Sequence, residues 1–178
     1  LQEASGWVVY TLSRNALSAA WAHILAQRSA FEITAELLDA RSSIEANQAF
    51  VSMIVKPLGA SRAVLIRRRL MGRARMVAVS EQSRFDRRQR LNDLTEQVGH
   101  EAILRREMLV WQHGDAHGSV LATLAEAHGD AALAAIPLSD ASGEMRDVVV
   151  LHWEQISHMP DLALWTPLWV LLRPANAL

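Results

Sequence analysis

Residues 131–154 read AALAAIPLSDASGEMRDVVVLHWE. Two apolar runs, Ala131 to Leu138 and Met145 to Glu154, flank the polar segment Ser139 to Gly143. Small and β-branched residues separated by turn-forming residues are typical of an antiparallel hairpin. The unbroken run Val148 to Leu151 lacks the alternation of a half-exposed strand, so it predicts a strand buried on both faces. We expect this hairpin at the centre of a sheet.

Helical and strand-like patterns alternate ahead of this hairpin, and a helix is expected after it. Ser42 and Glu45 have the spacing of a capping box, Asp115 is placed to cap a helix from His117, and Gly129 is placed to end that helix. The order predicts one α+β domain. The predicted helices cover residues 17–41 (one long helix or two short ones), 44–58, 86–102, 117–128 and 160–172, and the further predicted strands cover residues 63–66, 76–79 and 108–111.

Length and composition fit a single folded unit. The chain has 178 residues, 51% of them hydrophobic, with a formal net charge of -1 and a pI near 6.7. This bulk charge gives no reason to expect nucleic acid as a partner. The absence of cysteine excludes disulfides, thiolate metal ligands, cysteine nucleophiles and thioether-linked cofactors. We therefore expect no cofactor.

No signal peptide is visible in the sequence, and its most apolar stretch is too short to span a membrane alone. Residues 1–6 lack an initiator Met and a charged region ahead of an apolar one, so we expect a fragment without a signal peptide. Residues 162–172 are the most apolar stretch, about half of the roughly 20 residues that a membrane-spanning helix needs.

Charge is segregated along the chain. The stretch Arg62 to Arg90 holds ten Arg against Glu81 and Asp86, whereas the rest carries 8 basic and 17 acidic residues. Such a stretch forms either an anion-binding face or one side of an internal charge match between sheet and helices. We favour the internal match.

The segment from Ile44 to Trp153, about 110 residues by these boundaries, resembles a GAF domain. The residues that carry the resemblance are Gly59 to Leu65, Ala134 to Leu138 and Val148 to Leu151. The resemblance implies a central antiparallel sheet of five to six strands, flanked by N- and C-terminal helices, and a sensory or regulatory role without catalysis. It divides the chain into a helical arm (1–41), a GAF-like domain (42–158) and a C-terminal flanking helix (159–178).

This sequence departs from well-known GAF subtypes. It lacks the Asn-Lys-Phe-Asp-Glu motif of cyclic-nucleotide-binding GAF domains and any cysteine for bilin attachment or for methionine sulfoxide reduction. A narrower resemblance rests on Val77 to Ser80 and Arg84 to Arg88. This part looks like the GAF-like segment of HlyD-type membrane fusion (periplasmic adaptor) proteins of bacterial efflux and secretion systems.

A small anionic ligand is the binding hypothesis. Arginines around a helix N-terminus can clamp a phosphate or carboxylate, because the exposed amides there already favour anions; solvated surface arginines are the alternative. Arg90 to Asp93 also matches the short R-x-x-D signature of cyclic-dinucleotide sites. The predicted ligand-binding residues are Arg84, Arg87, Arg88, Trp111, His113 and His117.

Two further motifs have a functional and a structural interpretation. In His113-Gly114-Asp115-Ala116-His117, two imidazoles and a carboxylate could converge on one metal ion, with His152 or His158 approaching in space. We favour Asp115 as a helix cap and predict no metal site. Arg69 to Ala74 matches the R-x-x-G-x-A pattern of acetyltransferases, but the alternating residues after it favour a glycine in a hairpin turn.

Tryptophan is concentrated in the two flanks. Trp21, Trp165 and Trp169 are the predicted homodimer interface, because aromatic side chains give large contact areas for little lost entropy. Packing of the arm on the last helix, or contact with a bilayer surface, are the alternatives. No catalytic residue is predicted, since Gly-x-Ser-x-Gly and paired carboxylates are absent.

The two resemblances imply a non-catalytic sensory domain of a larger bacterial transport or secretion protein. It would lie in the cytoplasm, either within a soluble parent protein or as the soluble domain of a parent protein that is anchored in the inner membrane. It would bind a small ligand or a protein partner and signal through its flanking helices. The alternative is a purely structural dimerisation or assembly domain without a ligand.

Overall fold

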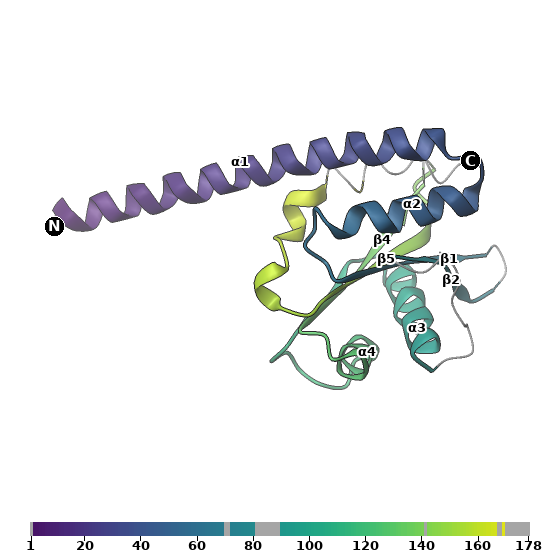
Figure 1. Ribbon diagram of the computed structural model, residues 1–178. Helices are drawn as coiled ribbons and strands as arrows, with labels where there is room; N and C mark the ends of the chain where they lie inside the picture. Colours follow the sequence, from purple (N-terminus) through teal and green to yellow (C-terminus); the bar gives the residue numbers. More distant parts are fainter. Residues whose placement is uncertain (1, 70–71, 81–89, 141, 167–168, 170–178) are drawn as a thin grey trace.

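A computed structural model describes residues 2–69, 72–80, 90–140, 142–166 and 169, with side chains described from Ala20 onward (Figure 1). The elements are α1 (Gln2–Asp39), α2 (Ser43–Val55), β1 (Arg62–Arg68), β2 (Ala74–Val79), α3 (Arg90–Arg105), β3 (Leu109–Gln112), α4 (Val120–His128), β4 (Ala132–Ser139), β5 (Met145–Trp153) and the 3-10 helices η1 (Ile156–His158) and η2 (Leu162–Trp165).

The five strands form one sheet in the order β2-β1-β5-β4-β3, and every neighbouring pair is antiparallel. The predicted hairpin lies at its centre, with β5 paired to both β1 and β4. Its turn is held by Asp140, whose Oδ1 accepts hydrogen bonds from the backbone N–H groups of Ser142 (2.8 Å) and Glu144 (3.0 Å). The prediction of an α+β fold with a five-stranded antiparallel sheet is confirmed.

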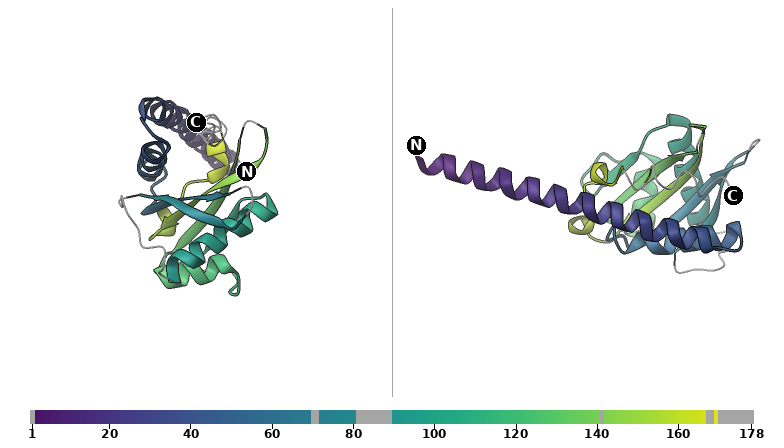
Figure 2. Two further views of the ribbon diagram at one scale, coloured as in Figure 1. Left: turned by 90° about the vertical axis from the view of Figure 1, so that its right-hand side faces the viewer. Right: turned by 90° about the horizontal axis from the view of Figure 1, so that it is seen from above.

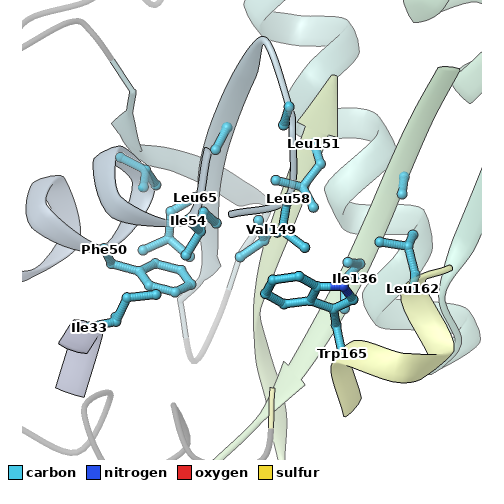
Figure 3. Packing of buried hydrophobic residues seen from close by; sticks show 14 of the residues in the cluster. Ile33, Phe50, Ile54, Leu58, Leu65, Ile136, Val149, Leu151, Leu162 and Trp165 are labelled. Atoms are coloured by element: carbon cyan, nitrogen blue, oxygen red, sulfur yellow. The ribbon is translucent and has the colours of Figure 1, made fainter. Parts of the chain in front are cut away.

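Helices cover both faces of the sheet (Figure 1). One face packs on α1, α2 and η2, and the other on α3 and α4. Strand β5 supplies both layers: Val149, Leu151 and Trp153 belong to the first cluster, and Val148 and Val150 to the second. This explains the continuous apolar run in the sequence. Figure 3 shows part of the first cluster.

Close packing of α3 on β1 requires a residue without a side chain. A Cβ added to Gly99 would lie 2.5 Å from Cδ1 and 2.9 Å from Cγ2 of Ile66, a fully buried β1 residue. These contacts are shorter than van der Waals distance, so α3 could approach the sheet this closely only with glycine at this position.

Helix ends follow the sequence signals in two places and depart from them in one. Ser42 Oγ accepts from the Glu45 backbone N–H (3.2 Å), as the capping box predicts. Gly129 ends α4 with φ 77°, as predicted. Asp115, however, does not cap a helix from His117: α4 begins at Val120, and Ser119 Oγ accepts from the Ala122 backbone N–H.

The N-terminal arm is one continuous helix whose N-terminal part projects away from the sheet (Figure 2). The described side chains of α1 form two apolar faces of the helix. Ala26, Ala30, Ile33 and Leu37 pack into the core. The opposite face exposes Trp21, Ile24, Leu25, Phe31 and Leu38.

The C-terminal segment differs from the helix expected from Pro160. The described residues form η2 as a 3-10 helix from Leu162 to Trp165, with Asp161 Oδ1 accepting from the Ala163 backbone N–H. Most of the predicted helix beyond Trp165 lies outside the described residues, as does the Asp86 cap predicted for α3. Among the helices described, none combines the length and apolarity needed to cross a bilayer.

Candidate functional site

A pocket of about 610 Å³ lies between edge strand β2 and helix α3. Cations come from the strand side, at Arg73 and Arg75, and carboxylates from the helix side. Drug-sized and metabolite-sized ligands occupy cavities of roughly 300–1,000 Å³, so the volume suits a small molecule. The lining residues are Arg73, Ala74, Arg75, Asp93, Glu96, Gln97, His100, Glu101 and Leu104.

Glu96, which lines this pocket, links α3 to β2 through hydrogen bonds. Its buried carboxylate accepts from the Met76 backbone N–H (3.1 Å) and from Arg75 Nη1 (2.7 Å). The helix therefore satisfies a backbone donor of the strand. Arg73 has no ion pair with any described residue, and His100 Nδ1 is buried without a hydrogen-bond partner among them.

Two arginines of the basic stretch from Arg62 to Arg90 form ion pairs with carboxylates of the same chain. Arg67 forms a bidentate pair with Asp147, with distances of 2.7 and 2.9 Å, directly across the β1–β5 pairing. The hydrogen bonds to Asp147 raise the pKa of Arg67. Together with Arg75–Glu96, this pair fits the internal charge match that the sequence favoured.

A second, smaller pocket of about 290 Å³ lies where this stretch meets the start of α2. Arg67 and Arg75 face it while paired to carboxylates, and the exposed Arg69 adds a third cation. It is lined by Ser43, Ile44, Asn47, Arg67, Arg69, Arg75, Met76 and Val77.

The described members of the predicted ligand-binding set, Trp111, His113 and His117, line neither of these two pockets. Trp111 is buried between the sheet and α3/α4, with its ring edge to face against His113 at 6.5 Å between centroids. His113 and His117 are exposed, and His117 Nδ1 lies 2.8 Å from Glu126 Oε1. Arg84, Arg87 and Arg88 lie outside the described residues.

The predicted interface tryptophans are in different environments. Trp21 on α1 is 60% exposed, whereas Trp165 is buried in the core of its own chain beside Leu162 (Figure 3). Trp169 packs against that core and is partly buried. In the single chain, Trp21 is therefore the member of this set with the most surface left for a partner.

A polar cluster that sequence reasoning missed lies at the other end of the sheet. His128 ends α4, Asp130 precedes β4, and His152 extends from β5 on the face covered by α3 and α4. Asp130 Oδ2 lies 2.7 Å from His152 Nδ1, and the rings of His128 and His152 meet at 5.0 Å between centroids. His152 is 1% exposed, and its Nε2 has no hydrogen-bond partner among the described residues.

Burial has the largest effect on the pKa of His128. Desolvation lowers the pKa of His128, and the neighbouring His152 and Arg62 lower it further, while Asp130 opposes them. A carboxylate can only accept, so the Nδ1 of His152 that faces Asp130 carries the proton. The signals in the sequence were a second His-Gly-Asp tripeptide at residues 128–130 and a polar residue inside the buried run of β5.

Comparison with known proteins was informative at the level of structure alone. No family model and no curated protein sequence matches the chain. Solved structures match over most of it. A putative GAF sensor protein from Burkholderia vietnamiensis aligns with a TM-score of 0.61 at 13% identity, covering 85% of this chain and 88% of that one.

The fold is that of a GAF domain. The phycocyanobilin-bound GAF domain of a cyanobacterial phytochrome has a TM-score of 0.61 at 13% identity, covering 85% of this chain and 92% of that one. The chromophore-binding domain of the Stigmatella aurantiaca bacteriophytochrome has a TM-score of 0.57 at 16% identity, with 84% of this chain covered. The chain spans 58% of the length of that domain.

Proposed function

We propose that this chain is a sensory or regulatory GAF domain that binds a small molecule between β2 and α3. The observation that carries the proposal is the pocket of about 610 Å³ with convergent charged groups. A concave site of this size with a few oriented polar groups is the usual form of a ligand site. The proposed role is binding without catalysis.

The ligand that we favour carries an anionic group. Arg73 and Arg75 both line the strand side of the pocket. Arg75 is anchored by Glu96, whereas Arg73 has no carboxylate partner among the described residues. Guanidinium groups bind carboxylates and phosphates through paired hydrogen bonds. The carboxylates of Asp93 and Glu101 on the helix side suit a ligand that also carries a hydrogen-bond donor.

Native mass spectrometry of the gently purified chain tests this proposal. We expect a mass excess of one small molecule per chain, and its identification supplies the compound for titration. Arg73→Gln should abolish the ligand-dependent rise in melting temperature, because it removes the unpaired cation. Lys56→Gln, an exposed cation change outside the pocket, should leave that rise unchanged. Equal ligand responses in both variants would place the ligand elsewhere.

The signalling part of the proposal rests on α1. Trp21, Ile24, Arg28, Phe31, Ala35 and Leu38 recur at alternating steps of three and four residues. This is the spacing of a two-stranded coiled-coil seam. The seam lies on the side of α1 away from Ala26 and Ile33, which pack into the core. One face of α1 therefore contacts the rest of the domain, and the opposite face is exposed and can contact a second copy of the chain. We propose a homodimer through this seam.

A purely structural dimerisation domain is the second candidate, and the same exposed seam favours it. Sedimentation velocity over a concentration series separates the two candidates. An assembly domain should show concentration-dependent association and stability with no ligand response, whereas a sensor should also respond to the compound. Phe31→Glu should make either form monomeric, because it places a charge in the seam. Ile156→Glu, at an exposed position in η1, is the matched control.

The wider setting is also a proposal. We propose that the parent is a bacterial transport or secretion protein and that this domain lies in the cytoplasm. The support is the resemblance of residues 77–80 and 84–88 to HlyD-type adaptor proteins, and the three structures compared above do not belong to that class.

A further inference from the structure

The polar cluster at the α4–β4 junction has the composition of a metal site. His128, Asp130 and His152 each offer one donor atom, and these atoms lie within 4.8 Å of one another. Imidazole nitrogens suit divalent first-row transition metals such as zinc, nickel or cobalt, and a carboxylate commonly orients an imidazole that binds such an ion. Sulfur ligands are absent because the chain has no cysteine.

The backbone holds these three residues together. Gly129, at φ 77°, reverses the chain after α4, and the Asp130 backbone N–H donates to Ala125 O (2.9 Å). His128 and Asp130 are thereby presented on either side of a fixed turn. His152 faces the turn from β5, where its pairing with Leu133 of β4 fixes its position. The site is therefore formed by two segments of regular structure and one tight turn.

His152 has a buried ring nitrogen for which the described residues supply no hydrogen-bond partner. The side chain is 1% exposed, and Nδ1 is used by Asp130. Nε2 is buried without a hydrogen-bond partner among the described residues. In the neutral ring that carries its proton on Nδ1, Nε2 has a lone pair, and burying this lone pair is costly unless something binds it. A carboxylate that orients a histidine in this way is the common outer contact of metal-bound imidazole.

We propose that one divalent transition-metal ion binds His152 at Nε2 together with the half-buried His128, and that Asp130 is the outer contact that holds the His152 ring in place through Nδ1. Donors on a common ion lie about 3–4 Å apart when each bond is about 2.1 Å long. Arg62 lies opposite His152 in the β1–β5 strand pairing. The positive charge of Arg62 disfavours a cation beside His128, and the negative charge of Asp130 offsets this effect. The proposed site is separate from the pocket between β2 and α3 and does not depend on a ligand there.

Zinc titration of the metal-free 178-residue chain tests the site by calorimetry at neutral pH, with cobalt absorption as a second readout. We expect one ion per chain. His128→Gln and Asp130→Asn should each weaken binding by at least about tenfold, the scale seen when a contact of a metal site is removed. Thermal unfolding followed by circular dichroism shows whether each variant is folded. His128 is half-buried, so its variant keeps the test open if Asp130→Asn fails to fold.

The matched control is the double variant His113→Gln, His117→Gln, which removes the exposed histidines of the other His-Gly-Asp segment. It should bind zinc as tightly as the wild type. The proposal is overturned if the control loses binding while His128→Gln retains it. It is also overturned if the folded wild type binds no zinc at high micromolar concentrations, as expected where a buried water occupies the position beside His152.

Discussion

The tripeptide His-Gly-Asp occurs twice in this chain, at residues 113–115 and at residues 128–130, and the two copies have different environments. In both, the glycine has a positive φ, 103° at Gly114 and 77° at Gly129. In the first copy all three residues are exposed, and the aspartate binds its own loop through the Gln112 backbone N–H (2.8 Å). Within the described parts of the chain, no residue of another strand contacts both His113 and Asp115.

The second copy follows a helix and precedes a buried strand. Its glycine completes the hydrogen-bonded end of α4, so Asp130 emerges at a fixed place and meets His152 at 2.7 Å. The comparison shows that the tripeptide itself carries little chemistry. The residue that faces it from another strand decides whether the histidine and the aspartate become a site.

The largest expected difference between the copies is in stability. Asp130→Ala should lower the free energy of unfolding by about 2–4 kcal/mol, because it leaves a buried imidazole without its carboxylate. Asp115→Ala should cost about 1 kcal/mol or less, since it removes one exposed hydrogen bond. Urea unfolding of both variants in the presence of a chelator measures this. Losses of equal size would show that the contact with His152 contributes nothing.

A smaller difference is expected at the glycines. Gly129→Ala should cost about 1–2 kcal/mol, because a Cβ is strained at positive φ and the turn is fixed between α4 and β4. Gly114→Ala should cost less, since the exposed loop around it can adopt another backbone conformation. Thermal melts of the two variants give the comparison. A more costly change at Gly114 would contradict the idea that the second turn is the more constrained one.

The smallest expected difference is in pH dependence. The pKa of folded His128 lies below its usual value of about 6.5, so the unfolded chain takes up this proton first as the pH falls. The contribution of His128 to the free energy of unfolding is therefore constant above a pH of about 6.5. This contribution falls as the pH drops from there to the pKa of His128 in the folded chain. His128→Gln should flatten the plot of unfolding free energy against pH in this window.

His113→Gln serves as the control and should keep the wild-type slope. The groups that face His128 are His152, Arg62 and Asp130, so Arg62→Gln should reduce the slope without removing it. An unchanged slope in His128→Gln would show that its imidazole titrates normally in the folded chain.

The fold could be predicted because its signals are local. The hairpin of residues 131–154 shows its burial in its composition, and Ser42 and Gly129 mark helix ends through backbone bonds that involve only a few residues. The first residue of α4 was mispredicted because Asp115 and Ser119 are both good caps, and the structure places the helix start after the second. Local patterns do not rank two such competitors.

The candidate sites could not be predicted in the same way, because they depend on pairings between distant residues. Glu96 on α3 reaches Met76 on β2, and Asp130 reaches His152. The separations along the chain are 20 and 22 residues, with no fixed motif between the partners. In α1 the apolar period at Trp21 and Phe31 was read correctly as helical, but the period alone did not show that this face points away from the core.

The unbroken helix α1 behaves as a lever. Its core contacts from Ala26 to Leu37 cover about 17 Å of axis, and the part from Ala26 back to Gln2 extends about 36 Å beyond them, at about 1.5 Å per residue. A tilt that moves one end of the core segment by a given amount relative to the other moves the far tip by about two to three times as much, depending on which end is fixed. Displacements in the core that are too small to change the packing of the sheet therefore become larger movements at the N-terminal end.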